Sequence, residues 1–166
     1  VFEEWNQGEL RSYLIEITAA ILKRTDPDTG LALVDCILDE AQQKGTGKWT
    51  SQNAFDIGAP IPTINAAVES RLLSAIKSER VTAAKVLGRA GSFTGDRQAL
   101  VAAAEQALYA SKITSYAQGL SLLKMASREY SWELDLSRIV PVWRAGCIIR
   151  ASLLSDITNA YRRSPD

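Results

Sequence analysis

The 166-residue sequence contains no histidine, only two cysteines and one methionine, and as many acidic as basic side chains, 19 of each. The missing histidine excludes nucleophiles of the Ser-His-Asp and Cys-His types and most zinc sites, so we expect no metal. Because the net charge is zero, no extended positive field is available to hold a nucleic acid, and we expect none as a partner. The longest stretch without a charge, residues 57–68, is too short and too proline-rich to cross a bilayer, so we expect no membrane partner.

The two cysteines, Cys36 and Cys147, lie far apart in apolar, helical patterns. This placement favours buried thiols in a reducing compartment, with a disulfide between them as the alternative. The N-terminus carries no signal-peptide pattern. The chain starts at Val1 and its only methionine is Met125, which indicates a processed chain, an engineered protein or a fragment.

Apolar residues recur every three or four positions along most of the chain, which is the period of an amphipathic α-helix. The clearest case runs from Gln98 to about Glu129 and predicts one long helix, in which Gly119 indicates close packing. Further helices are predicted over residues 8–25, 33–44, 50–57, 62–79 and 81–87, and from residue 136 or 141 toward the C-terminus. Three glycines predict a loop over residues 88–96. We therefore predict one all-α, multi-helix domain with a long central helix.

The densest chemical signal is ILDEAQQKGTGKWT, residues 37–50. Two glycines flank Thr46 between Lys44 and Lys48, so the backbone N–H groups of a flexible turn can converge on one anion. A helix that starts after this turn would add its positive N-terminal end to the site. On the residues alone, anion binding and a purely structural helix–turn–helix both remain open.

Two known phosphate-binding motifs do not fit this segment. A Walker A loop would need glycine at position 42 and serine or threonine at position 49, where the chain has Gln42 and Trp49. A dinucleotide fingerprint would need a third glycine in place of Thr50 and a preceding strand. Asp35 and Asp39, spaced for one helical face, are interpreted as solvated or helix-stabilising charges rather than as an acid–base or metal pair.

KGTGKWT, preceded by ILDEA, resembles the signature of the 6-phosphogluconate dehydrogenase family. Further stretches resemble that family in the same order: FEEWNQGEL (2–10), SYLIEITAAIL (12–22), LVDCILDEA (33–41), SRLLSAIKSER (70–80), KITSYAQG (112–119) and RAGCIIRA (144–151). One departure is Gln42, where the family more often has a small residue. The resemblance covers essentially the whole chain and implies that residues 1–166 are a fragment of the family's helical substrate-binding and dimerisation domain. The nucleotide-binding domain and the C-terminal tail would then be absent.

The resemblance also implies the reaction. Members of this family are cytoplasmic homodimers of the pentose phosphate pathway that oxidise 6-phosphogluconate with NADP and decarboxylate the 3-keto acid to ribulose 5-phosphate and CO2. The family's catalytic lysine and glutamate would precede Val1, and its tail arginine and histidine would follow Asp166. We therefore expect no catalytic residue, no cofactor-binding residue and no dehydrogenase activity in this chain by itself.

Two substrate contacts carry over from the resemblance by position. Lys44 matches the family's substrate-binding lysine, and Arg71 matches its arginine on the 6-phosphate. Thr46 is a third candidate, through its hydroxyl. A guanidinium can make two parallel charge-assisted hydrogen bonds to a phosphate, whereas an ammonium acts as a point charge. The alternative for Arg71 is a solvated cation or an ion pair with Glu69 or Glu79.

A rival interpretation of the whole chain is a non-enzymatic α-helical scaffold or dimerisation module. Such a module would keep the family's packing without its chemistry. It predicts exposed apolar faces that find a partner and no preference for sugar phosphates.

Overall fold

The protein is described here by a computed structural model that covers residues 1–88 and 91–164. Within these ranges the chain forms helices joined by loops, with two isolated β-bridges and no β-strand. The elements are α1 (Phe2–Trp5), α2 (Tyr13–Leu22), α3 (Leu33–Cys36), α4 (Thr46–Asp56), α5 (Pro62–Ala75), α6 (Lys77–Leu87), α7 (Arg97–Glu129), α8 (Leu136–Ile139), the 3₁₀ helix η1 (Val140–Arg144) and α9 (Leu153–Arg163). The predicted all-α fold is confirmed.

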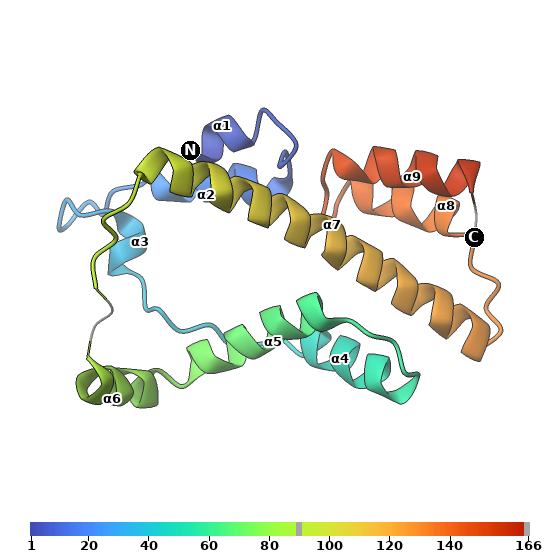
Figure 1. Ribbon diagram of the computed structural model, residues 1–166, viewed down its shortest axis with the longest axis horizontal. Helices are drawn as coiled ribbons and strands as arrows, with labels where there is room; N and C mark the ends of the chain where they lie inside the picture. The colour runs from blue at the N-terminus through green and yellow to red at the C-terminus, as the bar shows by residue number, and fades with distance from the viewer. Residues whose placement is uncertain (89–90, 165–166) are drawn as a thin grey trace.

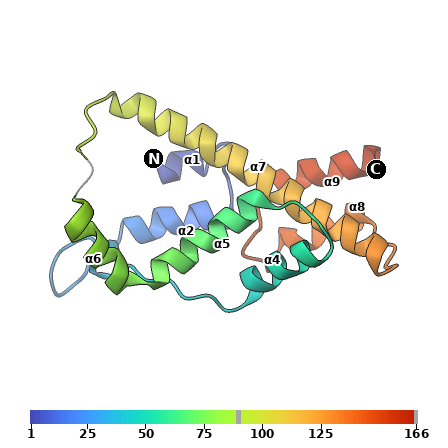
Figure 2. The ribbon, with the colours of Figure 1, turned by 60° about the horizontal axis from the view of Figure 1, so that its bottom comes forward.

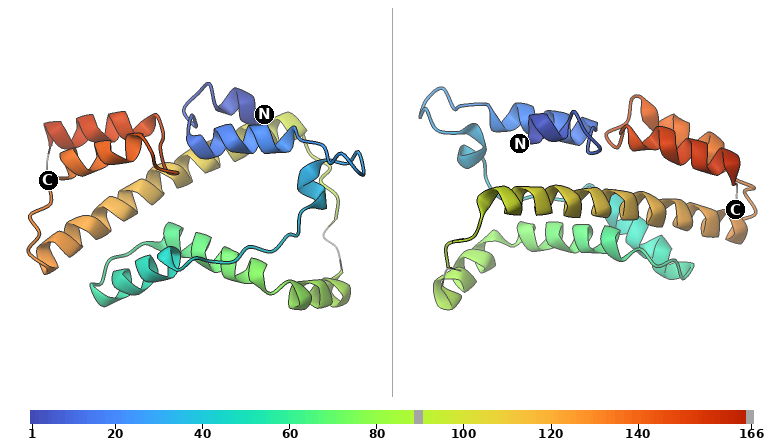
Figure 3. Two further views of the ribbon diagram at one scale, coloured as in Figure 1. Left: turned by 180° about the vertical axis from the view of Figure 1, so that it is seen from behind. Right: turned by 45° about the horizontal axis from the view of Figure 1, so that its top comes forward.

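The long helix α7 is the element against which the others are arranged (Figure 1). Its 33 residues span about 50 Å at 1.5 Å per residue. The Asp96 carboxylate caps its N-terminus by accepting hydrogen bonds from the backbone N–H groups of Gln98 and Ala99. Helices α1 and α2 lie beside its N-terminal half, α8 and α9 lie beside its C-terminal half, and α4 and α5 lie on the opposite side. Figure 3 shows this division from behind.

Among the residues that the structure describes, the buried side chains form three separate clusters along α7 instead of one core. Trp5, Leu10 and Ile15 pack against Val101 and Tyr109 near its start. Two further clusters lie toward its C-terminal end, one of Ala54, Ala59, Ile61 and Leu122, the other of Leu120, Leu136, Val140 and Leu154. The accessible surface is 12046 Å², whereas a compact monomer of this mass would expose about 8,100 Å². The fold is therefore open: α6 lies at the far end of α5, away from α7 (Figure 1), and Figure 2 shows α5 extending between α6 and the middle of α7.

The helix predicted over residues 33–44 is the largest error of the sequence analysis. Helix α3 ends at Cys36, and the backbone turns extended at Ile37, with φ −85° and ψ 140°. Ile37 and Leu38, which would have formed the buried stripe of that helix, are 57% and 62% exposed. Asp39 therefore does not share a helical face with Asp35. The backbone from residue 37 onward is instead held by side chains of α5 and α6, described below.

Other predicted boundaries differ by smaller amounts. The helix expected from residue 8 begins at Tyr13, where Ser12 supplies the cap. The helix expected over 62–79 is interrupted at Ile76, which separates α5 from α6. The last predicted helix is divided into α8, η1 and α9. Of the loop predicted over 88–96, residues 89 and 90 lie outside the described residues, and 91–96 are not helical.

The two cysteines carry free thiols, so the structure contains no disulfide between them. Cys147 is partly buried, but Cys36 is exposed, because α3 ends there and no core covers it. Its predicted burial is wrong. Among the helices of the described residues, none combines the length and the apolar character that a membrane span requires.

Candidate functional site

The predicted anion-binding segment lies at the start of α4. Lys44 ends the non-helical stretch that follows α3, Gly45 precedes the helix with a φ of 108°, and Thr46 is the first helical residue. This φ favours glycine, and a Cβ at position 45 would also lie 3.1 Å from Cζ2 of Trp49. No side chain caps the helix, so the first backbone N–H groups of α4 are left for other acceptors. Lys44 and Thr46 are both exposed.

This segment contacts α5 at two points. The backbone N–H of Ala41 donates to the Ser74 hydroxyl at 3.0 Å. Six residues later, Gly47 approaches α5 so closely that an added Cβ would lie 3.1 Å from Cγ2 of Val68. Positions 41 and 47 therefore meet positions 74 and 68, so the segment runs antiparallel to the helix.

This register places the segment of one candidate residue beside the helical turn of another. Lys44 is at the middle of the stretch between the two contacts, and Arg71 is at the middle of the matching stretch of α5. Positions 68, 71 and 74 follow one another at three-residue intervals, which places them along one ridge of a helix. The structure thus brings the segment that carries Lys44 and Thr46 next to the turn of α5 that carries Arg71.

Arg71 is exposed and makes no hydrogen bond or ion pair with any residue that the structure describes. The alternative of an ion pair with Glu69 or Glu79 is therefore absent from this structure. A second arginine nearby, Arg80 of α6, is in the opposite situation. Its Nη2 donates to the backbone carbonyls of Asp39, at 2.7 Å, and of Ser74, at 3.1 Å.

Asp39 lies in a charged cluster that the sequence pattern does not predict. Its carboxylate pairs with the ammonium of Lys77 and accepts hydrogen bonds from Arg80 at 3.3 and 3.4 Å. The hydrogen bond from Lys77, followed by its charge and by the bond from Arg80, holds the pKa of Asp39 below its ordinary value. The two partners lie 38 and 41 positions away in the chain, so no local spacing could have revealed them.

Beside this segment, α4 and α5 enclose a pocket of about 440 Å³. The Ser51 hydroxyl donates to Oδ1 of Asn65 at 2.8 Å and links the two helices across it. The pocket is lined by Gln43, Lys48, Ser51, Gln52, Phe55, Asn65, Val68, Glu69 and Leu72. Lys48, which the sequence places at the edge of the glycine-containing turn, is thus the only one of its two flanking lysines that lines this pocket. Lys44, Thr46 and Arg71 lie outside the lining.

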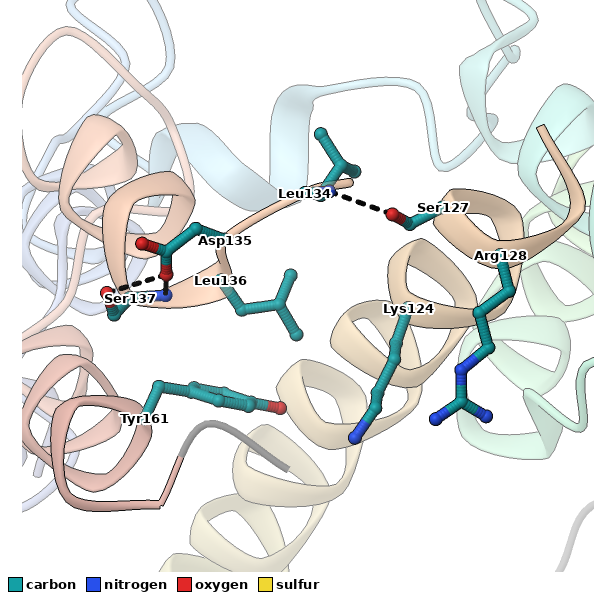
Figure 4. A pocket seen from close by; sticks show the side chains of 8 residues that line it. All are labelled: Lys124, Ser127, Arg128, Leu134, Asp135, Leu136, Ser137 and Tyr161. Atoms are coloured by element: carbon teal, nitrogen blue, oxygen red, sulfur yellow. Dashed lines mark hydrogen bonds between the residues drawn. The ribbon is translucent and has the colours of Figure 1, made fainter. Parts of the chain in front are cut away.

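Another pocket, of about 350 Å³, lies between α7 and α8 (Figure 4). Lys124 and Arg128 extend from successive turns of α7 on one side, and Tyr161 approaches from α9. The polar groups on the other side maintain the turn into α8: Ser127 accepts from the N–H of Leu134 at 2.9 Å, and Asp135 caps α8. Hydrogen bonds to Ser137, that of its hydroxyl above all, lower the pKa of Asp135. None of the residues predicted from the sequence lies in this pocket.

Comparison with known proteins gives a match over the whole chain. The family model described as 6-phosphogluconate dehydrogenase, C-terminal domain, matches residues 1–166. A 6-phosphogluconate dehydrogenase, decarboxylating, from Lactococcus lactis is 52% identical over 100% of this chain and 35% of its own length. The NADP(+)-dependent, decarboxylating enzyme of Bacillus subtilis is also 52% identical, over 100% of this chain and 36% of its own length.

A solved structure shows the same fold. The 6-phosphogluconate dehydrogenase of Plasmodium falciparum, described in its apo form and in complexes with NADP+ and with its substrate 6-phosphogluconate, superimposes with a TM-score of 0.92 at 44% identity. The match covers 99% of this chain and 36% of that one. The chain thus spans about a third of the length of these relatives.

Proposed function

We propose a function from the premise that this chain belongs to the 6-phosphogluconate dehydrogenase family, whose C-terminal domain model matches all of its residues. The chain is the part of the helical domain that holds the phosphate end of 6-phosphogluconate, in a longer NADP-dependent enzyme that converts this substrate to ribulose 5-phosphate and CO2. Lys44, Arg71 and Thr46 are the substrate-binding residues.

The observation that carries the proposal is the antiparallel register of residues 41–47 against α5. It supports a single site to which Lys44 and Arg71 contribute from two segments. A phosphate monoester carries a charge of about −1.5 to −2 near neutral pH. Two cations with a hydroxyl and the uncapped N-terminus of α4 offer the positive charges and hydrogen-bond donors that such a group requires.

Binding at the phosphate end contributes to the rate as well as to affinity. Holding a remote, unreactive part of the substrate places its reacting carbon and lowers the entropic cost of the transition state. In the longer enzyme, a lysine outside this chain removes the proton of the C3 hydroxyl, and a glutamate outside it protonates the enediol left after CO2 departs. NADP, when bound, accepts the hydride. The chain by itself is inactive.

We assign NADP to a part of the enzyme outside these residues. A dinucleotide is held at a glycine-rich turn between a parallel strand and a helix. The described residues contain no strand, and KGTGKW follows an extended segment without the third glycine. We also propose a homodimer in the cytoplasm. Support for the homodimer comes from the accessible surface of the chain, which is larger than that of a compact monomer. The cytoplasmic location rests on the family resemblance.

The test is NADPH formation from 6-phosphogluconate by the full-length protein that carries this chain, with Arg71→Ala measured alongside. We expect turnover, and a loss of kcat/KM of roughly tenfold or more in the variant, equivalent to about 1.4 kcal/mol. Arg162→Ala, at an exposed arginine of α9, should leave kcat/KM unchanged. If Arg71→Ala leaves kcat/KM unchanged, the proposed reaction stands but the proposed phosphate site is wrong.

The rival function is a non-enzymatic scaffold or dimerisation module, and the exposed apolar side chains of α2, α5 and α6 favour it. The same experiment separates the two. A correctly folded full-length protein without turnover and without binding of 6-phosphogluconate would support the scaffold.

A further inference from the structure

We propose that Arg80 is a positioning residue that acts through Asp39 and sets the placement of Lys44 and Thr46 opposite Arg71. This inference deepens the proposed function and rests on it. Arg80 belongs to α6, outside both segments that carry the substrate-binding residues, and it would touch neither substrate nor cofactor.

The contacts of Arg80 join three segments. Its Nη2 donates to the carbonyl of Ser74 at the end of α5 and to the carbonyl of Asp39 in the extended stretch, at 3.1 and 2.7 Å. Its Nη1 donates to the Asp39 carboxylate at 3.3 Å, and Lys77 pairs with the same carboxylate. The planar guanidinium therefore holds the backbone and the side chain of Asp39 together, a geometry that one ammonium cannot reproduce.

The stretch that Arg80 holds has few other attachments. Ile37 and Leu38 are largely exposed, so apolar burial contributes little to fixing its path. Between Cys36 and the start of α4, the hydrogen bonds that the structure shows to other segments are those to Asp39 and the bond from Ala41 to Ser74. Ser74 takes part in both attachments, accepting from Ala41 through its hydroxyl and from Arg80 through its carbonyl.

The consequence for the site follows from the register. Gly47 against Val68 fixes one end of the stretch, and the attachments at Asp39 and Ala41 fix the other. Lys44 lies between them. Without Arg80 the second end keeps only the hydrogen bond from Ala41 to Ser74 and the ion pair of Asp39 with Lys77, so Lys44 is held less firmly over the turn of α5 that carries Arg71. A displacement of about 1 Å at a site of this kind can cost as much as about 100-fold in rate.

The experiment compares Arg80→Ala, Arg80→Lys and Asp39→Asn with the unaltered full-length protein. We expect Arg80→Ala to raise the KM for 6-phosphogluconate by roughly tenfold or more while the KM for NADP changes less than about twofold. Arg80→Lys should restore part of the loss, because an ammonium can bind either the Asp39 carbonyl or its carboxylate. Asp39→Asn keeps the hydrogen bond from Arg80 to the backbone carbonyl. Its KM for 6-phosphogluconate should therefore lie between that of the unaltered protein and that of Arg80→Ala.

Two controls separate positioning from stability and from the proposed function. Lys85→Ala removes an exposed cation from the same helix and should change neither KM. In the double variant Arg80→Ala/Arg71→Ala, the rise in the KM for 6-phosphogluconate should be smaller than the product of the two single rises. The placement of Lys44 matters less once Arg71 no longer binds the same phosphate.

Each other outcome overturns the inference in a recognisable way. If Arg71→Ala raises the KM for 6-phosphogluconate but Arg80→Ala and Asp39→Asn do not, the positioning role is wrong and the proposed function stands. If Arg80→Ala raises both KM values and lowers the unfolding temperature, and Arg80→Lys restores neither KM, the residue is only structural. Absence of turnover in the unaltered protein would remove the proposed function itself.

Discussion

At the scale of single residues, Tyr116 links α7 to the loop before α9. Its hydroxyl donates to the carbonyl of Ile149, and its ring packs against the cluster around Leu120. Burial, and next the proximity of the Cys147 thiol, raise the pKa of Tyr116 to about 12. The folded state therefore favours the neutral phenol more strongly than the unfolded state does.

This shift gives stability a defined pH dependence. The contribution of Tyr116 is complete below the ordinary tyrosine pKa of about 10 and is lost as the pH rises through 12. We expect Tyr116→Phe to lower the free energy of unfolding by about 1 kcal/mol at pH 8, with a smaller difference at pH 11. Urea unfolding at both pH values measures this. Tyr13→Phe is the control, and an equal loss at the two pH values would contradict the prediction.

Gly119 gives a prediction of opposite sign. The sequence predicts close packing there, but an added Cβ would lie 4.0 Å from Cδ1 of Ile64, an ordinary contact. Gly119→Ala should therefore stabilise the chain by up to about 1 kcal/mol, since alanine favours the helix. Gly47→Ala is the matched comparison and should destabilise, because its Cβ would press on Val68. Thermal unfolding of both variants checks the pair, and a destabilised Gly119→Ala would mean that this part of α7 is packed more tightly.

The sequence can indicate residues that are neighbours along the chain, but it cannot indicate contacts that only folding brings about. A motif such as KGTGKWT is contiguous, so its residues could be selected before the fold was known. Arg80 interacts with Asp39 across 41 positions, and only the folded backbone brings them together. The roles of Lys44, Thr46 and Arg71 stay predictions until the binding experiment is done.

At the scale of elements, α5 depends on α7 for its N-terminal cap. The helix begins at Pro62 after Ile61, which offers no side-chain acceptor. Oε1 of Gln118 accepts from the N–H groups of Thr63 and Ile64 at 3.0 and 3.3 Å, and its Nε2 donates to the Thr63 hydroxyl at 3.1 Å. One amide thus supplies the cap that the local sequence lacks.

We expect Gln118→Ala to lower the free energy of unfolding by about 1 kcal/mol, the usual cost of losing a cap. Amide exchange at Thr63 and Ile64 should accelerate more than exchange elsewhere in α5. Gln106→Ala, at an exposed position of α7, the helix that also carries Gln118, should change the free energy of unfolding by less than about 0.5 kcal/mol. Equal effects of the two substitutions would show that the cap contributes nothing.

Element prediction from periodicity worked where packing follows the period. The sequence predicts α7 to within a residue because apolar positions recur along its whole length. The stretch after Cys36 has the same period, but its apolar side chains meet no core, and hydrogen bonds with Ser74 and Arg80 hold its backbone on a path that is not helical. Tertiary hydrogen bonds of this kind leave no trace in local spacing.

At the scale of the whole molecule, the surface is about half as large again as that of a compact monomer of this mass. Three small clusters along α7 replace a continuous core. Large apolar side chains remain exposed on α5 and α6, among them Leu73, Val86 and Leu87. Such a surface is typical of a chain that packs against further protein.

We therefore expect the isolated 166-residue chain to self-associate and to bind a hydrophobic dye. Sedimentation over a range of concentrations should show species larger than the monomer. The full-length protein, assayed at the same concentrations, should bind less dye per chain, because in the proposed homodimer further domains and a partner subunit would cover these faces. A monomeric isolated chain without dye binding would contradict the expectation.

The two contacts that hold residues 41–47 on α5 leave chain to spare between them. Six peptide units connect Ala41, which contacts Ser74, to Gly47, which approaches Val68, and they could reach about 20 Å when extended, whereas α5 rises only about 9 Å between positions 68 and 74. The backbone around Lys44 must therefore curve instead of following a straight line along α5. An inserted residue here can be accommodated by deepening this curve while both contacts persist, so we expect Lys44 to depend more on its attachments than on the length of the stretch.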